Sequence, residues 1–274
     1  MQKLLKISDL EGLDDASRAI HLKAFASLRF LYMRLIEQRS EEVKYQVKIS
    51  PGTSRAQGVH ASEVAGCGRA LFYGMRGVER KSNNTNTGMI MRFNLGHAIH
   101  ALLQHDFRLI CEKFAHEGAT LSFEKEAKIS PALGGAAEEW NIHSSCDGVF
   151  TWYEDGEPVR RLGLEIKSES EKGFLDLHNP RDKHRAQTTV YMKCLDLPMI
   201  WVLYYNKSNS NFTAPSPPWL FQFNHNAWDQ LERRIADATI NVRREHLPDK
   251  EETYECSWCP FAWTCGPKSA KEKK

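Results

Sequence analysis

The order of strand-like and helix-like patterns constrains the fold of this chain most. Five segments have the alternating or continuously apolar pattern of strands: residues 121–129, 140–153, 159–168, 199–207 and 219–224. Asp155 and Gly156 join the second and third segments in a dipeptide typical of hairpins. The helical pattern of residues 182–197 lies between the third and fourth segments. Because a single helical crossover within a group of strands favours a mixed sheet, we predict an α/β core.

Helical patterns flank this strand region on both sides. They cover residues 8–45, 63–75, 89–116 and 226–245. Ser62 is placed to cap the second of these helices. We expect residues 1–58 to form an N-terminal helical extension and residues 59–268 to form one domain with helical additions around its sheet. We expect residues 269–274 to form a disordered basic tail.

Composition and charge argue against several classes of protein. The 274 residues are 41% hydrophobic and 26% charged, which is ordinary for a globular protein. No apolar run approaches the ~20 residues that a membrane span needs, and the start of the chain turns acidic too early for a secretory signal. We therefore expect a cytoplasmic protein with no membrane partner. In that setting, seven cysteines indicate thiols or metal ligands rather than disulfides.

Two neighbouring strand-like segments carry charged side chains that a hairpin brings together. Asp147 lies on one, and Glu165 and Lys167 lie on the next, where strand alternation points both to one face. Converging carboxylates repel each other unless a cation neutralises them, and hard oxygen ligands suit Mg²⁺ or Mn²⁺. A nearby lysine is suited to activate a water or to stabilise charge on phosphorus. Taken alone, such a motif is more often a solvated strand face, but apolar Leu164 and Ile166 favour a central strand.

Three cysteines near the end of the chain have the spacing of metal ligands. Cys256, Cys259 and Cys265 form a C-x2-C-x5-C group. A closed tetrahedral thiolate site or a cubane cluster needs four ligands. On chemistry alone, four thiolates fit Zn²⁺ about as well as they fit an iron–sulfur cluster.

The charged strand motifs, together with a later helix, resemble a known family. Asp147, then Glu165-Ile166-Lys167, then Gln187 to Tyr191 are similar to the PD-(D/E)xK nuclease core of the RecB-like branch. The resemblance implies a restriction-endonuclease-like mixed sheet and a metal-dependent deoxyribonuclease. It also implies a metal-binding histidine on the helix before the strands, for which His97 is the first choice and His100 the second.

The same resemblance extends to nucleases with an iron–sulfur cluster, among them CRISPR-adaptation exonucleases and the nuclease domain of the AddB helicase subunit. It implies a [4Fe–4S] cluster held by Cys256, Cys259, Cys265 and a fourth ligand, Cys67. The cluster would join the N- and C-terminal additions, and Gly66 and Gly68 around Cys67 would leave room for it. Zn²⁺ remains the alternative metal. The other cysteines, by contrast, have the pattern of small buried hydrophobes: Cys111, Cys146 and Cys194.

The resemblance assigns a role to each candidate residue. Mg²⁺ or Mn²⁺ would bind His97, Asp147, Glu165 and the backbone carbonyl of Ile166, and Lys167 would help to activate water. Two residues on the following helix would orient the lysine, a water or a phosphate: Gln187 and Tyr191. Positive charge, rather than the resemblance, makes three residues candidates to contact DNA phosphates, with a solvated surface as the alternative for each: Arg69, Lys183 and Arg185.

The expected activity is that of an exonuclease on DNA ends or single strands in recombination, repair or replication. A helicase or recombination partner would deliver the substrate. The alternatives are a non-catalytic nucleic-acid-binding subunit built on the same core, and a nuclease stabilised by zinc.

Overall fold

The computed structural model describes most of the chain from residue 55 onward. The described residues are 31, 32, 35, 55–81, 87–113, 119–209, 219–251, 254–257 and 259–265. The predicted helix over residues 8–45, apart from Leu31, Tyr32 and Leu35, lies outside them, as does the predicted basic tail. None of the helices described in these ranges has the length and apolar composition of a membrane-spanning segment.

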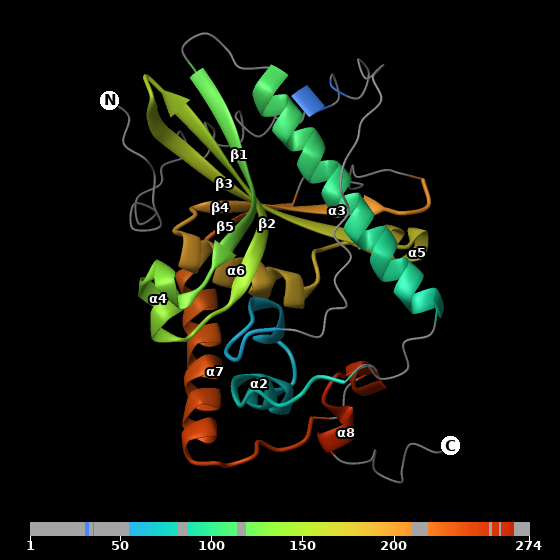
Figure 1. The fold of residues 1–274 in the computed structure, drawn as a ribbon, viewed down its shortest axis with the longest axis vertical. Helices are drawn as coiled ribbons and strands as arrows, with labels where there is room; N and C mark the ends of the chain where they lie inside the picture. Colours follow the sequence, from blue (N-terminus) through green and yellow to red (C-terminus); the bar gives the residue numbers. More distant parts are fainter. Residues whose placement is uncertain are drawn as a thin grey trace.

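A five-stranded mixed sheet forms the centre of the described structure (Figure 1). Its strands follow chain order: β1 (Ala119–Ile129), β2 (Ser144–Glu154), β3 (Glu157–Glu169), β4 (Met199–Asn206) and β5 (Trp219–Gln222). The first three strands are antiparallel, β4 is parallel to β3, and β5 is antiparallel to β4. The predicted α/β fold with a mixed sheet flanked by helices is therefore confirmed.

A tight turn joins β2 and β3, and a register shift follows it. Asp155 and Gly156 have φ angles of 52° and 83°, so both lie in the left-handed region. Two such residues in succession form the hairpin turn whose twist matches that of the flanking strands, and Asp-Gly is well suited to it. Glu154 pairs with Glu157, and the pairing then shifts by one residue beside Trp152, as at a β-bulge, so that Gly148 pairs with Leu164. The shifted register brings Asp147 beside the strand that carries Glu165.

Two helices cover opposite faces of the sheet. Helix α3 (Thr87–Lys113) packs against one face, where Ile99, Leu103 and Phe107 meet apolar side chains of β2, β3 and β4. Helix α6 (Asp182–Leu195) is the crossover from β3 to β4, and its Val190 joins the core on the other face. Because strand side chains alternate, each face receives every second residue of β3.

Shorter helices and one further long helix complete the structure. They are η2 (Ala61–Glu63), α2 (Gly68–Met75), η3 (Pro131–Leu133), α4 (Gly135–Glu139), α5 (Glu171–Leu175), α7 (His225–Arg243), η4 (Tyr254–Ser257) and α8 (Ala262–Cys265). The helix predicted over residues 63–75 is divided into η2 and α2. The predicted cap at Ser62 is wrong, since Ser62 lies within η2 and Cys67 is the residue that directly precedes α2. Helix α7 begins one residue before the predicted start, and the Asn224 side chain caps it by accepting a hydrogen bond from the Ala227 N–H.

Candidate active site

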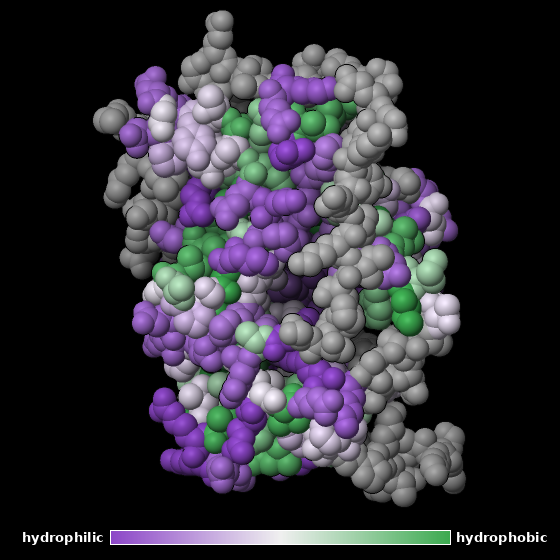
Figure 2. Space-filling view, in the orientation of Figure 1, coloured by the Kyte–Doolittle hydropathy of each residue, from purple (hydrophilic) through white to green (hydrophobic). Residues whose placement is uncertain are grey.

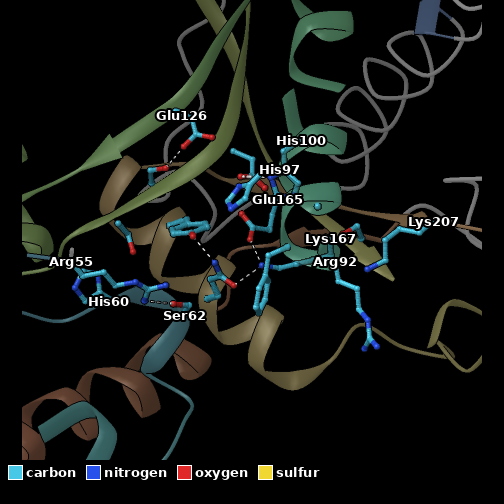
Figure 3. Close-up of a pocket in the computed structure, with 18 residues that line it drawn as sticks. Arg55, His60, Ser62, Arg92, His97, His100, Glu126, Glu165, Lys167 and Lys207 are labelled. Atoms are coloured by element: carbon cyan, nitrogen blue, oxygen red, sulfur yellow. Dashed lines mark hydrogen bonds and ion pairs between the residues drawn. The ribbon is translucent and has the colours of Figure 1, made fainter. Parts of the chain in front are cut away.

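A cleft of about 880 Å³ lies where α3, the sheet and α6 meet. Figure 2 shows hydrophilic side chains around a hollow near the middle of this face. The predicted catalytic residues come together here, because Asp147, Glu165, Lys167, Gln187 and Tyr191 all line the cleft. They reach it from β2, β3 and α6 (Figure 3).

Asp147 is held by contacts to both of its carboxylate oxygens. Its Oδ2 accepts a hydrogen bond of 2.6 Å from the Ile166 backbone N–H, and its Oδ1 lies 3.2 Å from Nδ1 of His100. Burial alone would raise the pKa of Asp147, but His100, Lys167 and the Ile166 N–H together hold it below its ordinary value. Asp147 is therefore a carboxylate at neutral pH.

Glu165 uses only one of its two carboxylate oxygens. Its Oε1 lies 2.5 Å from Nζ of Lys167, whereas its Oε2 is buried and has no hydrogen-bond partner. Burial and the negative charge of Asp147 raise the pKa of Glu165 to about 7. A buried carboxylate oxygen without a partner is costly, so this atom marks a place where a cation or donor would be stabilising.

Lys167 is held between β3 and α6. Its Nζ donates a hydrogen bond of 3.0 Å to Oε1 of Gln187, and Nε2 of Gln187 donates one of 2.6 Å to the Tyr191 hydroxyl. Burial lowers the pKa of Lys167, but the negative charges of Glu165 and Asp147 together raise it by more, so the net shift is upward. Burial raises the pKa of Tyr191, which stays neutral. Gln187 and Tyr191 of α6 thus fix the position of the charged Lys167 amine.

The donor set of the cleft fits a divalent cation. Within the described ranges, no three or more Cys, His, Asp or Glu side chains are grouped as a complete metal site. Mg²⁺ does not require such a group, since it is usually bound by one or two carboxylates together with waters and substrate phosphate. Asp147 and the unpartnered Oε2 of Glu165 provide these two carboxylates.

The two candidate histidines on α3 occupy different positions. His97 is exposed at the lining of the cleft, whereas His100, one turn later, contacts Asp147. Burial lowers the pKa of His100, but Asp147 raises it above its ordinary value, so the net shift is upward. The geometry therefore favours the second choice over the first for a contact at Asp147, while metal binding by His97 stays a prediction.

Three residues that the sequence analysis did not identify form a hydrogen-bond network with the Asp147 backbone. The Gln104 side-chain amide on α3 donates hydrogen bonds of 2.9 Å to the Asp147 carbonyl and to Oε1 of Glu126. Oγ of Ser145 donates one of 2.5 Å to Oε2 of Glu126. Glu126 has a φ of 54° and lies opposite Asp147 at an unpaired position, with the register of β1 and β2 unchanged on either side of it. The alternating pattern of β1 gives no signal of this backbone conformation.

The basic residues predicted to contact DNA do not line the cleft. Nε of Arg69 donates a hydrogen bond of 2.6 Å to the Pro248 carbonyl, and its Nη1 donates one of 3.3 Å to the Cys265 carbonyl. Lys183 lies 3.2 Å from Glu255 in an ion pair. The guanidinium of Arg185 lies 5.5 Å from the ring centre of Phe221. All three side chains therefore have protein partners, and their contact with DNA stays a prediction.

The four cysteines predicted to hold a cluster share one neighbourhood. Phe72 and Tyr73 of α2 pack with Phe261, and Cys259 and Cys265 lie against this group. Burial raises the pKa of Cys259, and the charges of three further thiols add to that rise: Cys67, Cys256 and Cys265. These thiols are close enough to interact electrostatically, although they are not arranged at ligand distances.

The comparisons with known proteins give structural likenesses only. No protein-family model matches the chain, and no curated protein matches its sequence. A solved structure of SSO0001 superposes with a TM-score of 0.45 at 15% identity, covering 86% of this chain and 95% of that one. An alkaline exonuclease from Laribacter hongkongensis superposes at 0.46 and 13% identity, covering 69% of this chain and 90% of that one. The same exonuclease with dAMP gives 0.46 at 14% identity, over the same shares of the two chains.

Proposed function

We propose that the protein is a metal-dependent DNA nuclease that hydrolyses phosphodiester bonds in this cleft. The observation that carries the proposal is the unpartnered, buried Oε2 of Glu165 beside Asp147, with the Lys167 amine 2.5 Å from the other oxygen. Two carboxylates and a lysine at one open cleft suit a phosphate that arrives together with a cation. The alternative of a non-catalytic nucleic-acid-binding subunit does not explain why a carboxylate oxygen is buried without a partner.

Each residue has a part in the proposed reaction. Asp147 and Glu165 would hold Mg²⁺ or Mn²⁺, with the Ile166 carbonyl and His97 as the further predicted ligands. When bound, such a cation lowers the pKa of a bound water and polarises the phosphoryl group. In hydrolysis, the water oxygen bonds to phosphorus, one P–O bond to the sugar breaks, and a water proton passes to the leaving oxygen.

The charge of Lys167 suits it to stabilise the transition state. Its raised pKa keeps the amine protonated near neutral pH, so the amine acts as a hydrogen-bond donor rather than as a base. Gln187 holds Nζ at 3.0 Å and is itself fixed by Tyr191, which limits the movement of the amine. A pre-positioned cation that faces developing negative charge on phosphate oxygens contributes directly to catalysis.

We further propose that Cys67, Cys256, Cys259 and Cys265 hold a [4Fe–4S] cluster. The support is the packing of Cys259 and Cys265 in the cluster around Phe261, together with the electrostatic effect of Cys67 and Cys256 on Cys259 and the chemistry of four thiols. Zn²⁺ is the alternative, and the visible spectrum of anaerobically purified protein separates the two metals. Delivery of DNA by a helicase or recombination partner stays a prediction from the family resemblance.

Digestion of end-labelled DNA tests the proposed function. We expect wild-type protein to cleave linear DNA with Mg²⁺ or Mn²⁺ and not with EDTA, and Lys167→Ala to lose cleavage by about 100-fold or more. The matched control is Lys172→Ala, which removes an exposed lysine of α5 outside the cleft. Binding of DNA without cleavage under all metal conditions would favour the non-catalytic subunit instead.

Closed circular substrates test the proposed dependence on DNA ends. We expect linear single-stranded and double-stranded DNA to be degraded while covalently closed circles of either kind are spared. Rapid cutting of a closed single-stranded circle would identify an endonuclease.

A further inference from the structure

One end of the cleft carries three side chains that the proposed chemistry does not use. Arg92 and Phe93 of α3 and Lys207, directly after β4, line the same cleft as the carboxylates. Figure 3 shows Arg92 and Lys207 on one side of Glu165, and Arg55 and His60 on the opposite side. The cleft therefore continues past the catalytic residues at its α3 end.

The two cations at this end have no partner among the residues that the structure describes. Across the described residues, neither the Arg92 guanidinium nor the Lys207 amine makes a hydrogen bond or ion pair. At the opposite end, by contrast, Arg55 lies 2.9 Å from Glu63 in an ion pair. Unpaired cations lining a cleft beside a phosphate-cleaving site are available to contact the phosphates of a nucleic-acid strand.

These side chains are held close to the catalytic strand. The Lys207 backbone N–H donates a hydrogen bond of 2.9 Å to the carbonyl of Glu169, which is two residues after Lys167 on β3. Phe93 is one helical turn before His97, so both side chains lie on the same side of α3. A strand that reaches Lys167 can therefore also reach this end of the cleft.

Phe93 presents an open aromatic ring to this cleft. Its side chain is 57% exposed, although α3 buries Ile99, Leu103 and Phe107 in the core a few residues later. Nucleobases stack on such rings without regard to sequence, because every base has a π-face. A paired base already has both faces covered within a duplex, so stacking on Phe93 requires an unpaired base.

We propose that Phe93, Arg92 and Lys207 form a nucleotide subsite for single-stranded DNA beside the scissile phosphate. Phe93 stacks on one unpaired base, and the two cations bind the phosphates that flank it. The subsite rests on the proposed nuclease function, since it supplies the strand to that site, and it assigns single-stranded DNA as the form that enters the cleft.

Equilibrium binding tests the aromatic part of the subsite without any cleavage. The fluorescence anisotropy of a fluorescein-labelled oligodeoxythymidylate is measured with EDTA present. We expect Phe93→Ala to weaken binding by roughly 5- to 150-fold, the loss of one stacked base, and Phe93→Trp to retain it. The matched control is Met91→Ala, which removes an exposed side chain of the same helix that does not line the cleft.

A substrate series locates the stacked base. An abasic nucleotide is moved one position at a time from each end of the oligonucleotide. We expect one or two positions to weaken binding to the wild type and to have no further effect on Phe93→Ala, because the same contact is already missing. Identical abasic profiles for the wild type and Phe93→Ala would overturn the stacking contact.

Salt dependence tests the cationic part. For single strands, each phosphate that a protein cation neutralises contributes about 0.7 to the steepness of log affinity against log salt. We expect Arg92→Gln and Lys207→Gln each to flatten this slope by about that amount. The matched control is Lys128→Gln, which removes an exposed lysine of β1 outside the cleft.

The outcomes separate this subsite from the proposed function. Wild-type protein that binds single strands through Phe93 but never cleaves them keeps the subsite and removes the nuclease proposal. Wild-type protein that cleaves DNA, while Phe93→Ala binds and cleaves within twofold of it, overturns the subsite alone. No measurable binding of the oligonucleotide by the wild type also overturns it.

Discussion

At the scale of single residues, the site depends on how its buried charges share their partners. Glu165 gives one oxygen to Lys167 and leaves the other unpartnered, while Asp147 is fixed by the Ile166 N–H and His100. The two carboxylates therefore differ: the pKa of Asp147 is lowered, whereas that of Glu165 is raised to about 7. A cation bound between them would favour the ionised form of both.

Glu126 tests whether the residues behind Asp147 matter for catalysis. We expect Glu126→Ala to release Gln104 and so to loosen the Asp147 backbone, with a roughly 10- to 100-fold loss in apparent metal affinity or rate, as for other outer-shell partners. The measurement is the cleavage rate as a function of Mn²⁺ concentration. Glu124→Ala, which removes an exposed carboxylate of β1 outside the cleft, is the control and should behave as wild type.

His184 makes stability depend on pH. Burial and nearby cations lower its pKa from 6.5 to about 3, and its Nδ1 lies 2.6 Å from the Tyr204 hydroxyl. Between these values the unfolded chain binds a proton that the folded chain does not, so stability falls as pH falls below about 6.5. At pH 5 this loss reaches about 2 kcal/mol.

Urea unfolding at pH 8 and pH 5 measures this loss. The free energy of unfolding of the wild type should fall more than that of His184→Gln, which has no proton to gain. Equal falls in the two proteins would contradict the assignment.

At the scale of elements, the sequence predicts those helices, strands and turns that depend on short-range patterns. The β2–β3 hairpin follows from Asp155 and Gly156, and α6 follows from its position between two apolar strands. The short helices α4 and α5 were not predicted, since five residues carry too little periodicity to be recognised. The positive φ of Glu126, which lies opposite Asp147, is likewise not indicated by any local pattern.

Partners that lie far apart in the sequence set a similar limit on predicting the site. Asp147, Glu165, Lys167, Gln187 and Tyr191 could be grouped because adjacent strands and one crossover helix carry them. The protein partners of the predicted DNA-contact residues could not be predicted in this way. The Arg69 side chain, for example, donates a hydrogen bond to the Cys265 carbonyl, 196 positions away. Similarly, only the packing of α3 on the sheet brings His100 to Asp147.

Gly148 tests the packing of β1 on β2. A Cβ added at this position would lie 2.2 Å from the Phe123 ring, so the ring would have to move. We expect Gly148→Ala to lower the free energy of unfolding by about 1–3 kcal/mol, as in other overpacked cores. Urea unfolding measures the change. Adding Phe123→Leu should recover part of it, and strict additivity of the two changes would contradict the proposed clash.

At the scale of the whole molecule, the C-terminal segment (residues 254–257 and 259–265) contacts several distant parts of the chain. The Lys81 backbone N–H donates a hydrogen bond of 3.0 Å to the Pro260 carbonyl, and Lys183 of α6 pairs with Glu255. Phe261 of this segment packs against Phe72 and Tyr73 of α2. A metal held by Cys67 and the three C-terminal cysteines would close the domain into one large loop.

Cys67→Ser tests that closure. We expect loss of iron, loss of absorbance near ~400 nm and a large drop in stability, on the order of 5 kcal/mol by analogy with a disulfide across a loop of this size. Metal analysis and unfolding measure both effects. Cys194→Ser is the matched control, since burial raises the pKa of that thiol to about 12 and it lies on α6, away from the segment. Full iron content in Cys67→Ser would contradict the ligand assignment.

The central claim is that Asp147 and the free oxygen of Glu165 hold a divalent cation. Electron paramagnetic resonance of free Mn²⁺ during a titration measures this binding directly, without relying on activity. We predict saturable Mn²⁺ binding by the wild type that is lost in both Asp147→Asn and Glu165→Gln and kept in Glu124→Gln, an exposed carboxylate outside the cleft. Equal Mn²⁺ binding by the wild type and both cleft variants would contradict it.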